Sequence, residues 1–215
     1  MWVMYDSTDV GQIPTNAQAV AGYVGGHWPT YPELVKRFPH AQHLSIAVSA
    51  QEDADCLDIE KGDATPADAP GWYHRQRARG LTRPAFYGSL SLIPAIMSTL
   101  GFAGIPRSAY RILSAHYTGH PHICGPACGL SPPADGTQWT GGNRYDESLL
   151  SSAFFNAPPP SPLTPEEQLV IAHIRRLRQE IYNAAEHGQL PNGHPTQRGW
   201  RLHHRAERYQ LLKHP

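Results

Sequence analysis

Eight short apolar segments, each bounded by turn-forming residues, constrain the fold more than any other feature of this sequence. Several are continuous apolar runs rather than alternating ones, which is typical of parallel strands buried on both faces. The segments are 1–6, 19–24, 43–48, 56–60, 85–88, 110–116, 137–140 and 146–150. Helical patterns lie between some of them, at 31–38, 66–79 and 92–100. This alternation predicts an α/β protein, a TIM-like (β/α) barrel in which some helices are reduced.

The predicted barrel covers residues 1–155, and a change in composition follows it. Residues 156–163 are rich in proline and predict a stiff, extended linker. A capping box then predicts a helix over 164–187, in which apolar residues recur at spacings of three and four. Such an apolar seam requires a partner. We therefore expect the helical tail, residues 164–215, to self-associate or to bind a virion partner.

Charge and hydropathy exclude several classes of function. The 215 residues carry 18 Lys and Arg against 18 Asp and Glu, a formal net charge of zero, which argues against a nucleic-acid partner. No stretch approaches the ~20 apolar residues of a membrane helix, so we expect no membrane partner. The N-terminus has neither the basic region nor the apolar run of a signal peptide. Secretion by the usual route is therefore not expected.

Acidic residues lie at the ends of three predicted strands. Asp58 and Glu60 are two residues apart in the strand 56–60, so they project from the same face. Crowding and partial burial raise the pKa of one such carboxyl while the other stays ionised. A proton donor beside an anion is what glycosidic cleavage needs. Asp6 ends the first strand and Asp146 begins the last. Because these strands are neighbours in a closed barrel, we expect all four acids at one mouth.

These acids and the residues around them resemble the family 25 glycoside hydrolases, the Chalaropsis-type lysozymes, and more closely the related barrel proteins of actinobacteria and their phages. The resemblance covers about residues 1–152. The segments that carry it are, in chain order, Tyr5-Asp6-Ser7, Asp58-Ile59-Glu60, Tyr87-Gly88-Ser89, Leu113-Ser114-Ala115-His116-Tyr117, Gln138-Trp139-Thr140 and Tyr145-Asp146.

The resemblance implies a role for each acid. Glu60 would be the general acid/base. Asp58 would be the second catalytic carboxylate, either as nucleophile or as support for attack by the substrate's N-acetyl group. Asp6 and Asp146 would orient the others and bind sugar. The residues that would line the cleft are Tyr5, Tyr87, Tyr117, Gln138 and Trp139.

The same resemblance implies a bacterial cell-wall glycan as the substrate, cleaved by muramidase-type hydrolysis of peptidoglycan, and no cofactor. With no signal peptide, it predicts a protein of a phage virion or of the producing host's cytoplasm that acts at the bacterial cell wall.

A second interpretation is a catalytically degenerate barrel that binds wall glycan or forms a structural part of a phage tail. The third strand contains Leu44-Ser-Ile-Ala-Val-Ser where the lysozymes usually carry an aromatic and histidine pair. The second strand, residues 22–26, differs from their usual arginine-bearing version. These two strands favour the second interpretation, whereas the complete set of four acids favours hydrolysis.

The loop between the sixth and seventh strands contains two possible ligand types for zinc. Its candidates are His120, His122, Cys124 and Cys128, because thiolate and imidazole are the donors that zinc prefers. Their spacing matches no standard zinc pattern, and a Cys124–Cys128 disulfide or two free thiols are the alternatives. We therefore predict no metal in the site. If the chain does bind one, these four residues are the candidate ligands.

Overall fold

The computed structural model describes residues 1–142 and 144–155. The described residues all belong to one unit of the chain, Met1–Pro159. The predicted linker 156–163 and the predicted helical tail 164–215, including the helix over 164–187, lie outside the described residues.

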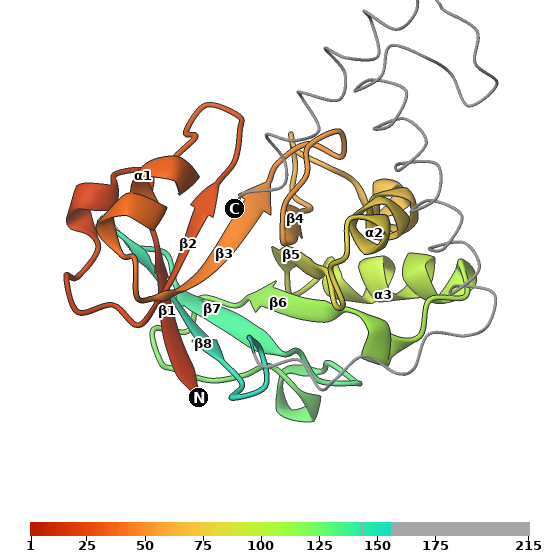
Figure 1. Cartoon of the computed structure of the whole chain (residues 1–215). Coiled ribbons are helices and arrows are strands. Elements are labelled where there is room, and N and C mark those ends of the chain that lie inside the picture. Colours follow the sequence, from red (N-terminus) through yellow and green to blue (C-terminus); the bar gives the residue numbers. More distant parts are fainter. Residues whose placement is uncertain (143, 156–215) are drawn as a thin grey trace, which may run out of the picture. The chain divides into compact units, whose positions relative to one another are not determined.

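Eight strands form a closed barrel in chain order (Figure 1). They are β1 Trp2–Asp6, β2 Ala19–Tyr23, β3 Gln42–Ala47, β4 Cys56–Asp58, β5 Ala85–Ser89, β6 Arg111–Ala115, β7 Gly136–Thr140 and β8 Asp146–Leu150. Each lies within one residue or so of a predicted segment, except that β4 stops two residues early, at Asp58. The barrel predicted from the apolar runs is confirmed.

The last strand departs from the expected parallel arrangement. Strands β1 to β7 pair in parallel, but β8 is antiparallel to both β1 and β7. The connection between β7 and β8 spans only residues 141–145. A parallel crossover needs about a dozen residues or more, so this link can only reverse the chain.

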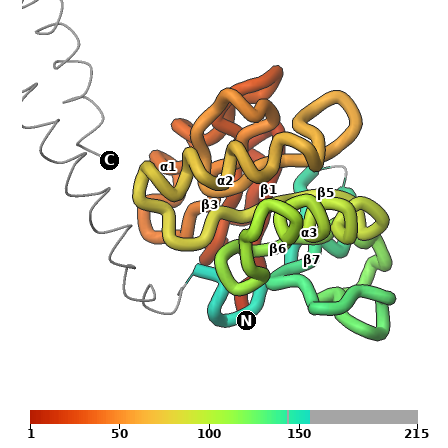
Figure 2. The backbone as a smooth tube through the Cα atoms, turned by 90° about the vertical axis from the view of Figure 1, so that its right-hand side faces the viewer, coloured from red at the N-terminus to blue at the C-terminus, as the bar shows by residue number. Residues whose placement is uncertain are grey.

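Three α-helices cover the outside of the barrel, at the places the sequence predicts. Helix α1 (Tyr31–Arg37) contacts β2 and β3. Helices α2 (Ala69–Ala78) and α3 (Ile93–Phe102) lie side by side (Figure 2). The short 3-10 turns are η1 Val10–Gln12, η2 Pro66–Asp68, η3 Arg107–Ala109 and η4 Pro126–Cys128. Within the described ranges, no helix has the length and apolar character needed to cross a bilayer.

Alternation along the strands separates the barrel interior from the layer beneath the helices. Small and apolar side chains fill the interior, namely Met4, Ala19, Ala21, Leu44, Ile46, Cys56, Ala85, Tyr87, Leu113, Ala115 and Leu150. Their sequence neighbours Leu57, Ile59 and Phe86 point outward and pack with Trp72 of α2. The interior residues of β1 and β4 continue directly into Asp6 and Asp58, so the pattern of burial aims these two acids inward.

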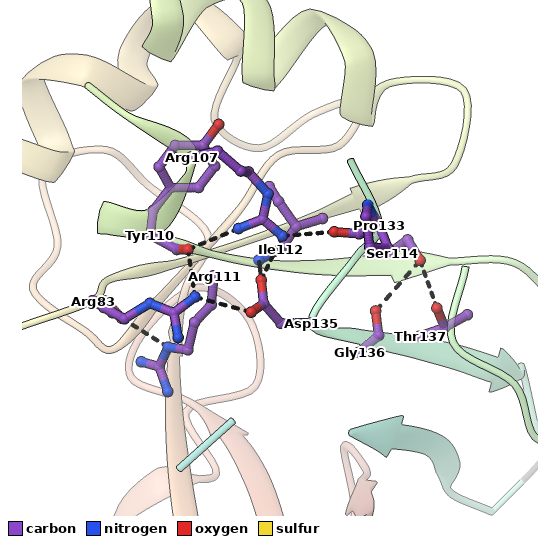
Figure 3. Close-up of polar contacts among 10 residues, drawn as sticks. All are labelled: Arg83, Arg107, Tyr110, Arg111, Ile112, Ser114, Pro133, Asp135, Gly136 and Thr137. Atoms are coloured by element: carbon purple, nitrogen blue, oxygen red, sulfur yellow. Dashed lines mark hydrogen bonds and ion pairs between the residues drawn. The ribbon is translucent and has the colours of Figure 1, made fainter. Parts of the chain in front are cut away.

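Asp135, just before β7, fixes the starts of three strands (Figure 3). Its carboxylate lies 2.9 Å from Arg83 Nη2 before β5 and 2.7 Å from Arg107 Nη2 before β6. The same carboxylate accepts a hydrogen bond from the backbone N–H of Ile112, at 2.8 Å. Only 15% of the Asp135 side chain is exposed. Because two cations depend on one mostly buried anion, its removal leaves charge without compensation.

We expect Asp135→Ala to lower the free energy of unfolding by about 3–5 kcal/mol, the usual cost of breaking a buried ion pair. Asp53→Ala is the matched control, because Asp53 also pairs with two arginines, Arg75 and Arg79, but its side chain is 46% exposed. An exposed pair of this kind is worth up to about 1 kcal/mol. Urea unfolding of both variants measures the difference, and equal losses would contradict a special role for Asp135.

Candidate functional site

The four predicted acids gather at the carboxyl end of the parallel strands. Asp6 is the last residue of β1, and Asp58 is the last residue of β4. Because β8 runs antiparallel, its first residue lies at that same end, and the register pairs Asp146 directly with Asp6. Glu60 follows β4 by two residues, and the intervening Ile59 continues the ladder through its N–H, which donates to Tyr87 O at 3.0 Å.

Burial and mutual repulsion hold protons on the two inner acids. Burial, followed by the charge of Asp146, raises the pKa of Asp6 to about 7. Burial, followed by the charges of Glu60, Asp63 and Asp6, raises the pKa of Asp58 to about 8. Asp58 Oδ1 is buried and has no hydrogen-bond partner among the described residues. At pH 7, Asp58 is therefore mostly protonated and Asp6 is about half protonated.

The two outer acids are better solvated. Glu60 is exposed at the mouth, and its pKa is raised by partial burial and by the charge of Asp63. Burial also raises the pKa of Asp146, but hydrogen bonds from the Gly142 backbone N–H, at 2.7 Å, and from Gln138 oppose this shift. The site thus combines buried carboxyls that retain protons near neutral pH with a carboxyl that solvent and substrate can reach.

Three tyrosines surround the carboxylates. Tyr87 of β5 is the register partner of Asp58, and its hydroxyl lies 3.2 Å from the hydroxyl of Tyr117, which follows β6. Burial raises the pKa of Tyr23, at the end of β2, and so do the charges of all four acids. The hydroxyl of Tyr23 is therefore close to the whole cluster.

Tyr23 is not in the set of cleft residues that the family resemblance implies. The register pairs Asp6 with Ala21, and Tyr23 lies two residues beyond Ala21 on the same inward face. Side chains two residues apart in a strand share a face, so alternation along the second strand identifies Tyr23 as a residue that faces the site.

The remaining predicted cleft residues lie in different environments. Gln138 of β7 is buried and hydrogen-bonds to Asp146, so it belongs to the cluster. Trp139 occupies an irregularity in the pairing of β7 with β8, and its buried indole N–H has no partner among the described residues. Tyr5 lies on the other face of β1 from Asp6. Its ring packs edge-on against Tyr145, outside the barrel interior.

The long loop between β6 and β7 brings together four possible metal ligands, His116, His122, Cys124 and Cys128. His116 takes the place that the sequence assigned to His120, which is exposed and contributes only its backbone carbonyl, an acceptor for His122 Nδ1 at 2.8 Å. Cys124 and Cys128 are free thiols here rather than a disulfide. The carboxylate cluster contains no residue of this set.

An apolar hollow lies at the opposite end of the barrel. Met97, Ile105, Tyr110 and Pro132 are among the residues that line it. Tyr110 precedes β6, so this hollow is at the amino end of the parallel strands. The acids and tyrosines lie at the carboxyl end, where barrel enzymes place their chemistry. The carboxylate cluster, and not the hollow, is therefore the candidate site.

Fold and site together define an eight-stranded α/β barrel with a cluster of carboxyl and phenol groups at its carboxyl end. No protein-family model matches the chain, and no curated protein does. Among solved structures, it is similar to one described as a virulence factor of Streptococcus pneumoniae, GHIP, a glycosyl hydrolase 25 participating in host cell invasion. The alignment covers 78% of this chain and 90% of that one, with 11% identity and a TM-score of 0.47.

The raised pKa values of the inner acids predict how stability depends on pH. The ordinary pKa of an aspartate is 3.8, whereas Asp6 and Asp58 titrate at about 7 and about 8 in the folded state. Folding therefore takes up protons between about pH 4 and pH 8, and the free energy of unfolding falls as pH rises through this window.

Asp58→Asn cannot ionise, so it should lose less stability than the wild type when the pH is raised from about 5 to about 8.5. We expect a relative gain of about 1–3 kcal/mol, measured by urea unfolding at both values. Asp68→Asn is the control, because hydrogen bonds from Thr65 lower the pKa of Asp68. That control should show no such gain. If Asp58→Asn and the wild type differ in free energy of unfolding by the same amount at both pH values, the raised pKa of Asp58 is contradicted.

Proposed function

We propose that the barrel is a glycoside hydrolase of the family 25 type, which cleaves a β-1,4 bond in bacterial cell-wall glycan by muramidase-type chemistry. The observation that carries this proposal is the gathering of Asp6, Asp58, Glu60 and Asp146 at one end of the barrel, with pKa values raised above their ordinary range. A group of acids that holds protons near neutral pH is suited to protonating a leaving oxygen.

Glu60 is the best placed of the four to act as the general acid. It is exposed at the mouth, where a glycosidic oxygen can approach, whereas Asp6 and Asp58 are buried. Its raised pKa increases the protonated fraction near neutral pH. After it protonates the leaving oxygen, the same carboxylate can take a proton from the water that completes hydrolysis.

The protonation state of Asp58 favours one of its two implied roles. A carboxyl with a pKa of about 8 is mostly neutral at pH 7, and a neutral carboxyl is a poor nucleophile. We therefore assign Asp58 to orienting the substrate's N-acetyl group, whose carbonyl oxygen would attack the anomeric carbon. Asp58 Oδ1 has no hydrogen-bond partner among the described residues, so its bonding capacity is not already used within the protein.

The tyrosines supply surfaces for the sugar. Tyr117 is 59% exposed beside the cluster and is held by its hydroxyl contact with Tyr87. A sugar ring presents an apolar face that can stack on an exposed phenol ring. Together with Tyr23 and Gln138, these residues would bind the glycan. Tyr5, which packs outside the interior, is left out of this set.

A specific observation favours the second candidate, a barrel that binds wall glycan without cleaving it and that serves as a module of a phage tail or other virion part. Strand β3 presents the apolar Leu44 and Ile46 to the interior, and the hydroxyl of Ser45 is bonded to Asp55 at 2.7 Å. This strand therefore contributes no polar group to the mouth.

The test is release of reducing sugar ends from purified cell walls of several bacteria, including actinobacteria. We expect Glu60→Gln to lose about 10²–10⁴-fold in rate, or about 3–5 kcal/mol of transition-state stabilisation, because only the proton donor is removed. Glu33→Gln, an exposed glutamate on α1, is the control and should retain the wild-type rate.

Equal rates for Glu60→Gln and the wild type would reject Glu60 as the acid. If the wild-type protein cosediments with walls but releases no reducing ends from any of them, the glycan-binding candidate replaces the hydrolase.

A further inference from the structure

The loop between β6 and β7 gathers two imidazoles and two thiols into one small space. His116 directly follows β6, and His122, Cys124 and Cys128 come from the loop itself. Their nearest ligand atoms all lie within 4.8 Å of one another. The cluster is separate from the carboxylates, and the proposed hydrolysis uses none of its residues.

Three of the distances within the cluster match the edges of a tetrahedron around zinc. Cys124 Sγ lies 3.4 Å from His116 Nδ1 and 3.5 Å from His122 Nε2, and these two nitrogens are 3.0 Å apart. Zinc bonds of about 2.3 Å to sulfur and about 2.0–2.1 Å to nitrogen, at tetrahedral angles, give N–S edges of about 3.5 Å and N–N edges of about 3.3 Å. A single ion therefore fits between these three atoms, and the fourth ligand atom, Cys128 Sγ, lies within 4.8 Å of each of them.

The tautomer of His122 is already set for metal binding. Its Nδ1 lies 2.8 Å from the backbone carbonyl of His120, which can only accept, so Nδ1 carries the proton. Nε2 then directs a lone pair into the cluster. A ring nitrogen that donates to a backbone carbonyl while the other faces the ion is the usual outer contact of a metal-bound histidine.

The loop is attached firmly enough to hold its ligands in place. The N–H of Cys124 donates to Thr137 Oγ1 at 2.8 Å, and this hydroxyl lies 2.8 Å from Ser114 Oγ, a pair that Figure 3 also shows. The N–H of Ala134 donates to Cys124 O at 2.9 Å. Cys124 is thus tied to both β6 and β7 by buried contacts.

We propose that His116, His122, Cys124 and Cys128 bind one zinc ion in a closed, tetrahedral structural site. Four protein ligands leave no open position for water or substrate, which is the pattern of structural rather than catalytic zinc. Each cysteine loses its thiol proton on binding, and two thiolates with Zn²⁺ sum to zero charge, so the ion can sit in this partly buried loop. Because His116 precedes Tyr117, the ion also fixes the chain beside the carboxylate mouth.

Cobalt substitution is the direct test, because tetrahedral Co²⁺ bound by thiolate gives visible d–d bands and a near-ultraviolet sulfur-to-cobalt band. The full chain, purified without a polyhistidine tag, is reduced, freed of metal with a chelator and titrated with Co²⁺ and then Zn²⁺. We expect about one equivalent of each and displacement of cobalt by zinc. The six histidines beyond residue 156 cannot imitate the sulfur band, because all three cysteines precede that residue.

Three variants identify the ligands. His116→Gln and Cys128→Ser, at two partly exposed positions, should each weaken zinc binding by more than the ~10–100-fold that loss of an outer contact costs. His120→Gln is the matched control in the same loop and should bind like the wild type, because only its backbone carbonyl is used. Circular dichroism establishes that each variant is folded.

Any of three results would overturn the proposal. These are a reduced wild-type chain without the sulfur-to-cobalt band, folded His116→Gln or Cys128→Ser protein with wild-type affinity, or a loss in His120→Gln as large as in the ligand variants. Cobalt that binds without the sulfur-to-cobalt band would assign the metal to other histidines and count against this site.

Discussion

The antiparallel strand β8 is the constraint on which the site depends. It pairs with β1 on one side and β7 on the other, and so it closes the barrel. Closure removes the free edges that an open sheet would expose. It also places the first residue of β8, Asp146, against the last residue of β1, Asp6. A parallel eighth strand would start at the opposite end of the barrel, and Asp146 would then lie far from the other acids.

The same closure also explains why the pKa values of the acids at the mouth are raised. The interior is filled by alanines and apolar side chains, so Asp6 and Asp58 have little water to stabilise a negative charge. They respond by holding protons rather than by pairing with cations. Among the described residues neither acid forms an ion pair, whereas Arg83 and Arg107 bind Asp135 at the amino end of the strands. The amino end of the strands is therefore held by ion pairs, while the carboxyl end collects acids whose pKa values are raised, which is typical of functional sites.

The loop between β6 and β7 connects this mouth to the proposed zinc site. The loop spans residues 116–135 and contains no α-helix, only the turn η4, so other contacts must order it. Its buried hydrogen bonds from Cys124 and the four clustered ligands meet that need. Tyr117 follows the first of these ligands and contacts Tyr87, so order in the loop extends to a residue beside the acids.

The sequence by itself determined the eight strands, the three helices and the four acids, because these follow from local patterns. Apolar runs of four to seven residues specify buried strands, and a period of two sets Asp58 and Glu60 on one side. Only the tertiary structure decided what depends on pairing between distant segments: the reversed direction of β8, the approach of Tyr23 to all four acids, and the place of Tyr5 outside the interior. His116 replaced His120 for the same reason. His120 is closer to Cys124 along the chain, so spacing favoured it. In the structure, the end of β6 places His116 against Cys124 instead.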